Sequence, residues 1–309
     1  MSAVDTAAAI LAATLRAGTP LVLAALGELV VERSGVLNLG VEGMMLTGAA
    51  AGFIAAVTTG HPTLGIVAAM LAGMLMALLF GALTLGLYAN QVATGLALSI
   101  FGTGLSAFVG RDYVDVPLEG LRPLALGGLS TLPLVGPLLL NYDALVYVSL
   151  ALCLIVHRFL FHSRAGLVLR AVGESPEAAH ALGYPVVGIR YLAVLFGGAM
   201  SGLAGAYLSL AYTPMWTENM TAGRGWIALA LVVFATWRPS RVLLGAYIFG
   251  FVTIFQLNIQ GIGIAFPAQL LSTLPYLATV IVLVAISRDA AKIRLNAPAS
   301  LGKAFRPGT

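Results

Sequence analysis

Residues 63–88 read TLGIVAAMLAGMLMALLFGALTLGLY and contain no charged side chain. The hydrocarbon core of a bilayer is about 30 Å thick, so a helix of roughly 20 apolar residues spans it. Open strands are excluded there, because lipid offers no hydrogen bonds to the groups at a strand edge. This stretch therefore predicts a transmembrane helix. The rest of the chain contains further long apolar segments of the same kind.

The composition of the whole chain extends this prediction. Of 309 residues, 60% are hydrophobic and 9% are charged, and the mean hydropathy is +0.98. A soluble domain carries about 25% charged residues, so this chain cannot cover a water-exposed surface. We expect an all-α polytopic bundle of about eight or nine spans, with room for broken or re-entrant helices. The apolar segments lie near 7–31, 36–58, 63–88, 92–110, 143–160, 191–212, 224–237, 242–258 and 268–287, and the seventh is short enough for a half-span.

The basic residues set the expected orientation. Eleven of the sixteen lie in three clusters, namely Arg158, Arg164, Arg170 and Arg190; Arg238 and Arg241; and Arg288, Lys292, Arg294, Lys303 and Arg306. Cytoplasmic loops are rich in Lys and Arg, so we expect these clusters and the C-terminus on the cytoplasmic face of a bacterial inner membrane. The stretch 111–142 then lies outside, and the side of the N-terminus depends on the span count. The basic residues lie between apolar segments and are not clustered on a polar domain, which argues against nucleic acid as a partner.

The chain divides into a transmembrane domain, residues 1–295, and a cytoplasmic tail, residues 296–309. The tail holds Pro298, Pro307 and several small residues, so we expect it to be disordered. The single cysteine, Cys153, lies in an apolar stretch and is interpreted as a small buried hydrophobe. The spacing of the four histidines predicts no metal site. No basic region precedes the first apolar segment, so we expect no cleaved signal peptide.

The loop 162–190 between two apolar segments contains a compact helix signal. Ser175 can cap the helix, Pro176 suits its first position, and Glu177 follows in the first turn. Gly183 is placed to end the helix, and Pro185 prevents its continuation. A short capped helix in a basic cytoplasmic loop can present a docking surface, although a plain connector between two spans would have the same signal.

Residues 173–183 read GESPEAAHALG, and this stretch resembles the ATPase-coupling loop of ABC importer permeases. The resemblance is to the permease family for simple sugars, nucleosides and branched-chain amino acids. It extends over nearly the whole chain through residues 27–52, 90–106 and 223–250, and it is closest to the shorter of two paired permeases in nucleoside-type systems. The coupling residues that it implies are Glu174, Ser175, Pro176, Glu177, Ala178, Ala179 and Gly183.

The resemblance implies a transport subunit that is not itself an enzyme and needs no cofactor. The chain lacks the G-x-x-x-x-G-K-[ST] loop that cradles phosphates, so ATP hydrolysis is expected in a separate ATPase subunit. The family also implies a second permease, either a related chain or a second copy, and an extracytoplasmic solute-binding protein. Membrane lipid surrounds the assembly. The expected function is a pathway for a nucleoside or simple sugar that works by alternating access.

Polar residues at the start of two apolar segments are candidates for the solute pathway. Asn38 and Glu42 lie among glycines, and irregular backbone at membrane depth is tolerated only inside protein or against a water-filled cavity. Asn90, Gln91 and Thr94 open the fourth segment, and amide side chains suit a neutral polyhydroxyl or nucleobase ligand. The structural alternative is a set of interhelical hydrogen bonds, together with a helix cap at the fourth segment.

Two other function classes remain open at this point. An ion-coupled secondary transporter would use Glu28 and Glu42 as proton or sodium sites and would transport without a partner ATPase. A membrane-embedded enzyme would need acids, histidines or cysteines clustered at one depth, and the sequence offers no such cluster.

Overall fold

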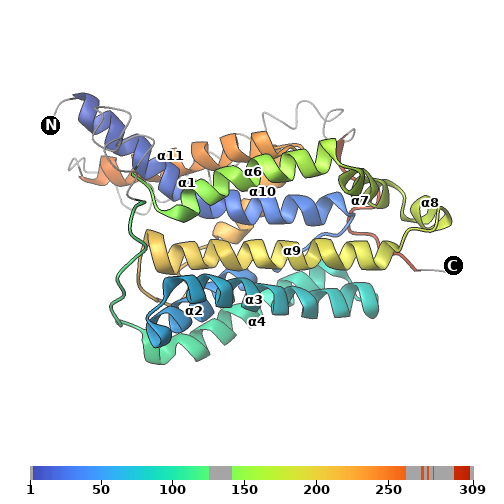
Figure 1. The fold of residues 1–309 in the computed structure, drawn as a ribbon, viewed down its shortest axis with the longest axis horizontal. Helices are drawn as coiled ribbons and strands as arrows, with labels where there is room; N and C mark the ends of the chain where they lie inside the picture. The colour runs from blue at the N-terminus through green and yellow to red at the C-terminus, as the bar shows by residue number, and fades with distance from the viewer. Residues whose placement is uncertain are drawn as a thin grey trace.

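A computed structural model describes residues 3–124, 141–261 and 296–306, together with positions 273, 274, 277 and 281. The described residues form helices and connecting segments, without a strand (Figure 1). The helices are α1 (Ala3–Arg33), α2 (Val41–Thr59), α3 (Pro62–Gly81), α4 (Gln91–Gly110), α6 (Ala144–His162), α7 (Arg164–Glu174), α8 (Pro176–Ala181), α9 (Val186–Tyr207), α10 (Arg224–Phe234) and α11 (Pro239–Gly261). Two π-helical turns, η1 (Ala82–Gly86) and η4 (Leu208–Tyr212), extend α3 and α9, and a 3₁₀ turn, η2 (Arg111–Tyr113), extends α4.

Seven of the described helices are long and apolar enough to cross a bilayer: α1, α2, α3, α4, α6, α9 and α11. The eighth apolar helix, α10, has 11 residues. Its length of about 16 Å is roughly half the hydrocarbon thickness. The short seventh segment of the sequence thus forms a helix too short to cross the bilayer, as its length suggested. The ninth predicted segment, 268–287, lies outside the described residues except for the four separate positions. The polytopic helical bundle is confirmed.

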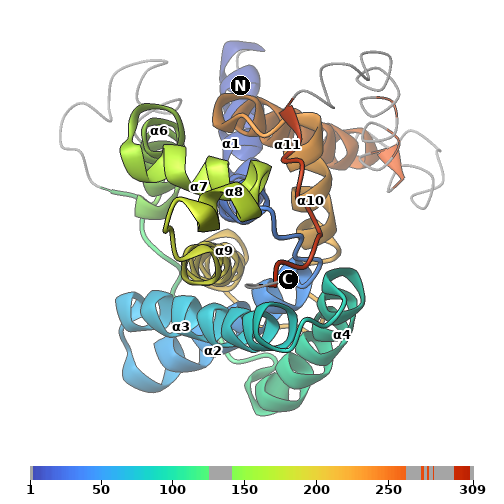
Figure 2. The same ribbon diagram turned by 90° about the vertical axis from the view of Figure 1, so that its right-hand side faces the viewer.

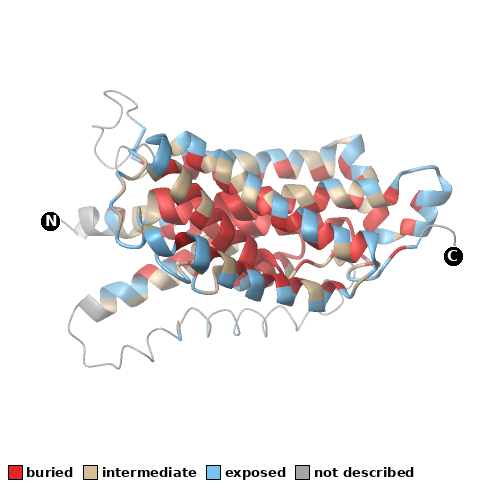
Figure 3. Ribbon diagram, turned by 90° about the horizontal axis from the view of Figure 1, so that it is seen from below, coloured by how far each residue is buried: buried red, intermediate tan, exposed pale blue. Residues whose placement is uncertain are grey.

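The pair α1 and α9 joins the two sides of the bundle. Helices α2 and α3 pack against α9, with α4 on the far side of α2, whereas α6, α10 and α11 pack against α1 (Figure 2). Buried residues concentrate between these helices, and exposed residues lie around them (Figure 3). The outer helices expose large apolar side chains such as Leu75, Ile100 and Leu154, as expected for surfaces that face lipid or another membrane subunit.

Glycines let the central helices touch backbone to backbone. A Cβ added to Gly48 of α2 would lie 2.5 Å from the Cα of Gly202 in α9. A Cβ added to Gly43 of α2 would lie 2.5 Å from the carbonyl oxygen of Leu98 in α4. Close approach through small residues is how helices pack in membranes, where lipid removes the hydrophobic drive between them.

The two ends of the bundle carry different segments. The N-terminus lies at the end where Leu121 N–H donates to the Leu210 carbonyl, and α7, α8 and the C-terminus lie at the other (Figure 1). The loop 164–185 therefore shares its end with the tail, on the side opposite to residues 111–124. We call the end with α7 and α8 the inner end.

The tail from Asn296 to Arg306 is packed against the inner end of the bundle. Ser300 N–H donates to the Gly173 carbonyl, Gly302 N–H donates to the Gly35 carbonyl, and the Phe305 side chain is buried. The prediction of a disordered tail is therefore wrong for residues 296–306. The carbonyls of Gly35 and Gly173, on two distant elements, accept from the tail backbone, and Gly35 leaves room for the Ser300 side chain, so these contacts order the tail despite its composition.

Candidate functional site

Two interruptions of the helical backbone meet inside the bundle. The first is residues 34–40 between α1 and α2, and the second is residues 213–223 between η4 and α10. Both end at the start of a helix that lies within the protein, since Val41, Thr221 and Ala228 are fully buried. The break predicted near Asn38 is therefore real. A second break, before α10, leaves the N-terminus of that helix buried inside the bundle.

Glu42 connects the two breaks. Its Oε1 accepts hydrogen bonds from Thr221 Oγ1 at 2.5 Å and from Gly223 N–H at 2.8 Å, and its Oε2 accepts from Gly225 N–H at 2.6 Å. These donors belong to the start of α10, where the first N–H groups lack helical partners and the dipole favours an anion. Gly225 is required, because a Cβ there would lie 2.6 Å from the Glu42 backbone. Glu42 thus caps α10 from α2.

Side chains from two other helices satisfy the backbone of residues 34–40. Leu37 N–H donates to Gln91 Oε1 at 2.8 Å, Asn38 N–H donates to Glu28 Oε1 at 3.1 Å, and Ser99 Oγ donates to the Leu39 carbonyl at 2.8 Å. Extended backbone inside a membrane is stable only when such partners exist. Glu28 Oε2 and Gln91 Nε2 are buried and have no hydrogen-bond partner among the described residues.

The other predicted pathway residues have local roles. Asn38 is buried, and its Oδ1 accepts from Gly40 N–H at 2.9 Å, which shapes the turn into α2. Asn90 is exposed and caps α4 by accepting from Ala93 N–H at 2.9 Å. Thr94 is half-buried one turn further along α4. The structure thus brings Asn38, Glu42 and Gln91 together around the first break and leaves Asn90 and Thr94 at its edge.

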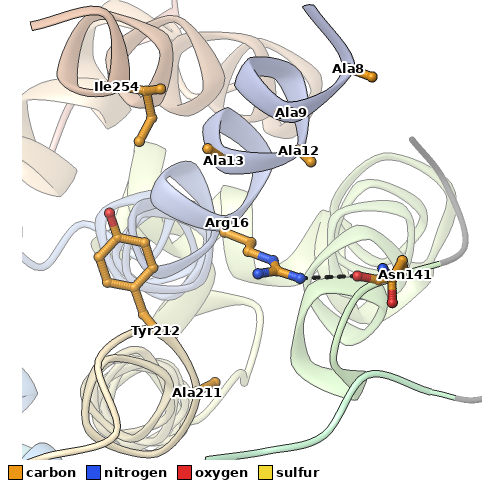
Figure 4. Close-up of a pocket in the computed structure, with 9 residues that line it drawn as sticks. All are labelled: Ala8, Ala9, Ala12, Ala13, Arg16, Asn141, Ala211, Tyr212 and Ile254. Atoms are coloured by element: carbon orange, nitrogen blue, oxygen red, sulfur yellow. Dashed lines mark hydrogen bonds between the residues drawn. The ribbon is translucent and has the colours of Figure 1, made fainter. Parts of the chain in front are cut away.

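A cavity of about 550 Å³ lies at the outer end between α1, η4 and α11 (Figure 4). Its wall is formed by Ala8, Ala9, Ala12, Ala13, Arg16, Asn141, Ala211, Tyr212 and Ile254. Arg16 points across the cavity and donates to the Asn141 carbonyl at 3.1 Å. The small side chains of α1 leave this space open. The polar groups in its wall are the Arg16 guanidinium, the Tyr212 phenol and the Asn141 amide, which could bind a small polar molecule.

Tyr212 links this cavity to the second break. The Arg224 guanidinium lies 5.9 Å from the centre of the Tyr212 ring, and its Nη1 donates to the carbonyls of Met220 and Thr221. Thr221 in turn donates to Glu42. These contacts connect the wall of the outer cavity, at Tyr212, to the buried start of α10.

The inner end presents α8 as predicted. Ser175 Oγ accepts from Ala178 N–H at 3.3 Å, Pro176 occupies the first turn, and Gly183 has a φ of +87°. Pro176 and Ala179 are buried against the bundle, whereas Glu174, Glu177, Ala178 and Gly183 are exposed and Ser175 is half-buried. Leu182 leaves 78% of its surface exposed beside them. This exposed apolar residue on a capped helix is typical of a docking surface.

A polytopic helical bundle with two broken segments and an exposed inner helix is the architecture of a membrane transport subunit. Comparison with known proteins gives the family: residues 10–285 match the model described as "Branched-chain amino acid transport system / permease component". The chain belongs to this family and is a permease subunit of an ABC importer, which decides against the ion-coupled transporter and the membrane-embedded enzyme.

Three relatives illustrate the similarity. The chain is 43% identical to the Putative glucose ABC transporter permease protein TsgC13 of Haloferax volcanii, over 97% of this chain and 98% of the relative. It is 32% identical to the guanosine ABC transporter permease protein NupQ of Bacillus subtilis, over 81% and 82% of the two chains. It is 30% identical to the nucleoside ABC transporter permease protein NupC of Lactococcus lactis, over 92% and 93%.

Sequence reasoning missed several residues of this site. Thr221, Gly223 and Gly225 hold Glu42, and their signal was a second glycine-containing break directly before the short apolar segment. Arg190 was interpreted only as a loop cation, but it is 1% exposed and lies inside α9. Ser300 lies in a stretch expected to be disordered, and no local pattern distinguishes it.

Proposed function

We propose that this chain forms part of the pathway by which an ABC importer moves a simple sugar or a nucleoside, and that a partner ATPase docks on α8. The observation that carries the docking proposal is the exposed, capped α8 at the inner end. Glu177 of α8 and Leu182 at its C-cap are exposed, and so is Glu174 at the end of α7, whose Oε2 accepts from Ala299 N–H at 3.4 Å. The inner end then faces the cytoplasm, together with the C-terminal tail.

The distribution of charge supports this orientation. Arg164, Arg170, Arg238, Arg241 and Lys303 all belong to segments at the inner end. Acidic side chains dominate the outer stretch, where Asp112 and Glu119 form ion pairs with Arg111 and Arg122. Such an asymmetry is the positive-inside pattern of a cytoplasmic face. The solute-binding protein then delivers substrate at the outer end.

The broken segments support a pathway through Gln91 and the Glu42 junction. Gln91 retains an amide NH₂ with no partner among the described residues. An uncharged donor suits a hydroxyl-rich or heterocyclic solute. When the solute leaves, a neutral amide remains without a partner, which costs less free energy than a buried unpaired charge. Glu42 is the positioning residue in this proposal, since both its oxygens already bind α10.

The substrate class follows from the charges and from the relatives. At the junction, both oxygens of Glu42 accept from protein donors, so this acid offers no free charge to an ionic substrate, whereas Glu28 Oε2 has no hydrogen-bond partner among the described residues. The relatives carry names for glucose, guanosine and nucleoside transport. We therefore assign this chain a neutral sugar or nucleoside. A second permease, either a related chain or a second copy, completes the pathway.

Cross-linking tests the docking proposal. The native cysteine, Cys153, is buried, so L182C supplies one accessible thiol on α8, and E119C supplies a matched thiol at the outer end. In membranes that contain the whole transporter, a maleimide–diazirine reagent, which bonds to the added thiol and on illumination inserts into a neighbouring group, should join L182C to the ATPase subunit and leave E119C unlinked to it. The opposite pattern would refute the docking proposal.

A functional variant tests the same surface. The double variant E174A/G183A should keep ATP hydrolysis and membrane insertion but lose most substrate uptake, because the Gly183 turn has a left-handed φ that alanine adopts poorly. Uptake equal to the wild-type rate would contradict the coupling role. Thermal-shift screening of the partner solute-binding protein with glucose, pentoses and nucleosides identifies the substrate.

A further inference from the structure

Residues 296–306, which we call the inner strap, touch α8 on one side. The Phe305 side chain is buried in a cluster with Val172, Ala179 and Val186. The rings of Phe305 and His180 lie 5.6 Å apart in an edge-to-face arrangement. Ala179 and His180 belong to α8, so this helix cannot shift without changing the packing of Phe305.

The other side of the inner strap holds the first broken segment. Gly302 N–H donates to the Gly35 carbonyl at 3.1 Å, directly before the extended residues that lead to Glu42. Ser300 N–H and Ser300 Oγ both donate to the Gly173 carbonyl at the end of α7, at 3.0 and 2.7 Å. The inner strap crosses the inner end of the bundle between these partners (Figure 2).

Arg190 forms hydrogen bonds with both the first broken segment and the inner strap. Its Nε donates to the Ser34 carbonyl at 3.1 Å, its Nη1 to the Lys303 carbonyl at 3.2 Å and its Nη2 to Ser300 Oγ at 3.0 Å. A planar guanidinium presents donors in fixed directions, which lysine cannot reproduce. Arg190 lies within 4 Å of no carboxylate in the part of the chain that the structure describes. Its charge is therefore held by the broken segment and the inner strap.

Two glycines make the close approach possible. A Cβ on Gly35, which has a φ of +87°, would lie 2.8 Å from Arg190 Nη2 and would also collide with Ser300 Oγ. A Cβ on Gly173 would collide with the Arg33 carbonyl. At the start of the inner strap, Arg33 Nη1 donates to the Asn296 carbonyl at 3.0 Å. The inner strap is thus fixed at both ends and in its middle.

We infer that the inner strap and Arg190 transmit movement of α8 to the broken segment 34–40, and so couple the ATPase to the pathway. The inference rests on the proposed docking of the ATPase on α8. Displacement of α8 moves Phe305, and the inner strap then shifts Gly35 through the Gly302 N–H bond and Ser34 through Arg190. Residues 34–40 carry this shift toward Glu42. Arg190 is a positioning residue in this relay.

Ser300 offers the mildest test, because one hydroxyl bridges Arg190 and Gly173. Reconstituted complexes with the ATPase and the solute-binding protein are supplied with labelled glucose or guanosine, and solute molecules imported per ATP hydrolysed are counted. S300A should lower this ratio about fivefold, because the hydroxyl's hydrogen bonds to Arg190 and to Gly173 are lost together, with ATP hydrolysis retained. The matched control is S201A, whose buried hydroxyl donates only to Gly197 within the same helix.

Truncation gives the larger change. A chain that ends at residue 295 lacks the inner strap and should import about tenfold less solute per ATP, because several of its hydrogen bonds are lost together. A chain that ends at Arg306 keeps the inner strap and should behave as wild type. If the shorter chain fails to reach the membrane, S300A decides the question.

A reversible covalent link separates transmission from folding. A Cβ on Gly302 would lie 3.9 Å from the Leu37 Cβ, within the range of about 3.5–4.5 Å for a disulfide. In a C153A/S300A background, the added pair L37C/G302C carries the strain of a cysteine at the left-handed Gly302 (φ +75°) in both redox states, so the reduced form is its own control. Oxidation should raise the import-per-ATP ratio, and reduction should lower it again. An S300A ratio equal to wild type would overturn the relay, whereas failure of L182C to reach the ATPase would overturn the docking proposal instead.

Discussion

The junction at Glu42, where the two broken segments meet, and the inner end of the bundle bury charge in opposite ways. At the junction, Glu42 accepts three hydrogen bonds from donors at the start of α10. At the inner end, Arg190 donates to two carbonyls and a hydroxyl from two other segments. Neither charge has an ionic partner among the described residues, where both ion pairs are exposed at the outer end.

The difference lies in what each charge holds. Glu42 joins two helix starts that are both surrounded by buried residues, so its bonds have few alternatives and the joint is stiff. Arg190 joins a broken segment to the inner strap, and the inner strap in turn packs against the exposed α8 through Phe305. The acid therefore contributes mainly to stability, and the arginine mainly to the transmission of movement.

Removal of Glu42 should give the largest loss of stability. E42A leaves two backbone N–H groups and the Thr221 hydroxyl buried without their acceptor, at a cost of about 1–3 kcal/mol each. We expect a total loss of about 4 kcal/mol, measured as a lower melting temperature in detergent. The control E119A alters only an exposed ion pair. A melting temperature of E42A equal to that of E119A would contradict the role of Glu42.

Replacement of Arg190 should cost less stability and more coupling. R190M keeps much of the side-chain volume and orphans acceptors rather than donors, so we expect a loss of about 2 kcal/mol. ATP hydrolysis should continue, while import per ATP falls further than in S300A. If R190M destabilised the protein more than E42A did, the comparison between the two regions would be reversed.

Gln91 should have a moderate effect that depends on chemistry. Q91L leaves Leu37 N–H without an acceptor, which costs about 1.5 kcal/mol, and it should weaken uptake. Q91E keeps an acceptor of the same shape but buries a carboxyl group in place of an amide, so it should recover only part of the stability and none of the uptake. Unchanged uptake kinetics in Q91L would remove this residue from the pathway.

The smallest effect is expected at Ser99. S99A removes a donor to the Leu39 carbonyl, which can accept weaker contacts, so the loss should be about 0.5–1 kcal/mol. Comparison of its melting temperature with that of S106A, whose hydroxyl bonds only within α4, isolates the contact to the broken segment. A loss as large as that of Q91L would show that segment 34–40 depends equally on every side-chain contact.

The sequence was sufficient for features that depend on local pattern. Apolar length predicted the spans and the short helix α10, and the Ser-Pro-Glu signal before Gly183 predicted α8. Glycines around Asn38 predicted the first break. The same glycines did not reveal what Glu42 binds, because Thr221 and Gly225 lie about 180 positions later and only the fold brings them close.

Long-range contacts explain what remained hidden. The inner strap forms hydrogen bonds with Gly35, Gly173 and Arg190, and each of these residues belongs to a different part of the chain. Composition alone favours disorder for residues 296–309. Arg190 was grouped with loop cations because a basic residue at a helix end is ordinary in membrane proteins. Arg190 can be buried because the carbonyls of Ser34 and Lys303, which are distant in the sequence, accept its hydrogen bonds.

Vesicle transport tests the central claim, that α8 receives the force of a partner ATPase, most directly. Vesicles that hold this chain with its second permease, and that are supplied with ATP and the solute-binding protein, should import labelled solute only when the ATPase subunit is present. An imposed proton or sodium gradient should have no effect without it. Import driven by an ion gradient through the permeases alone would contradict the account.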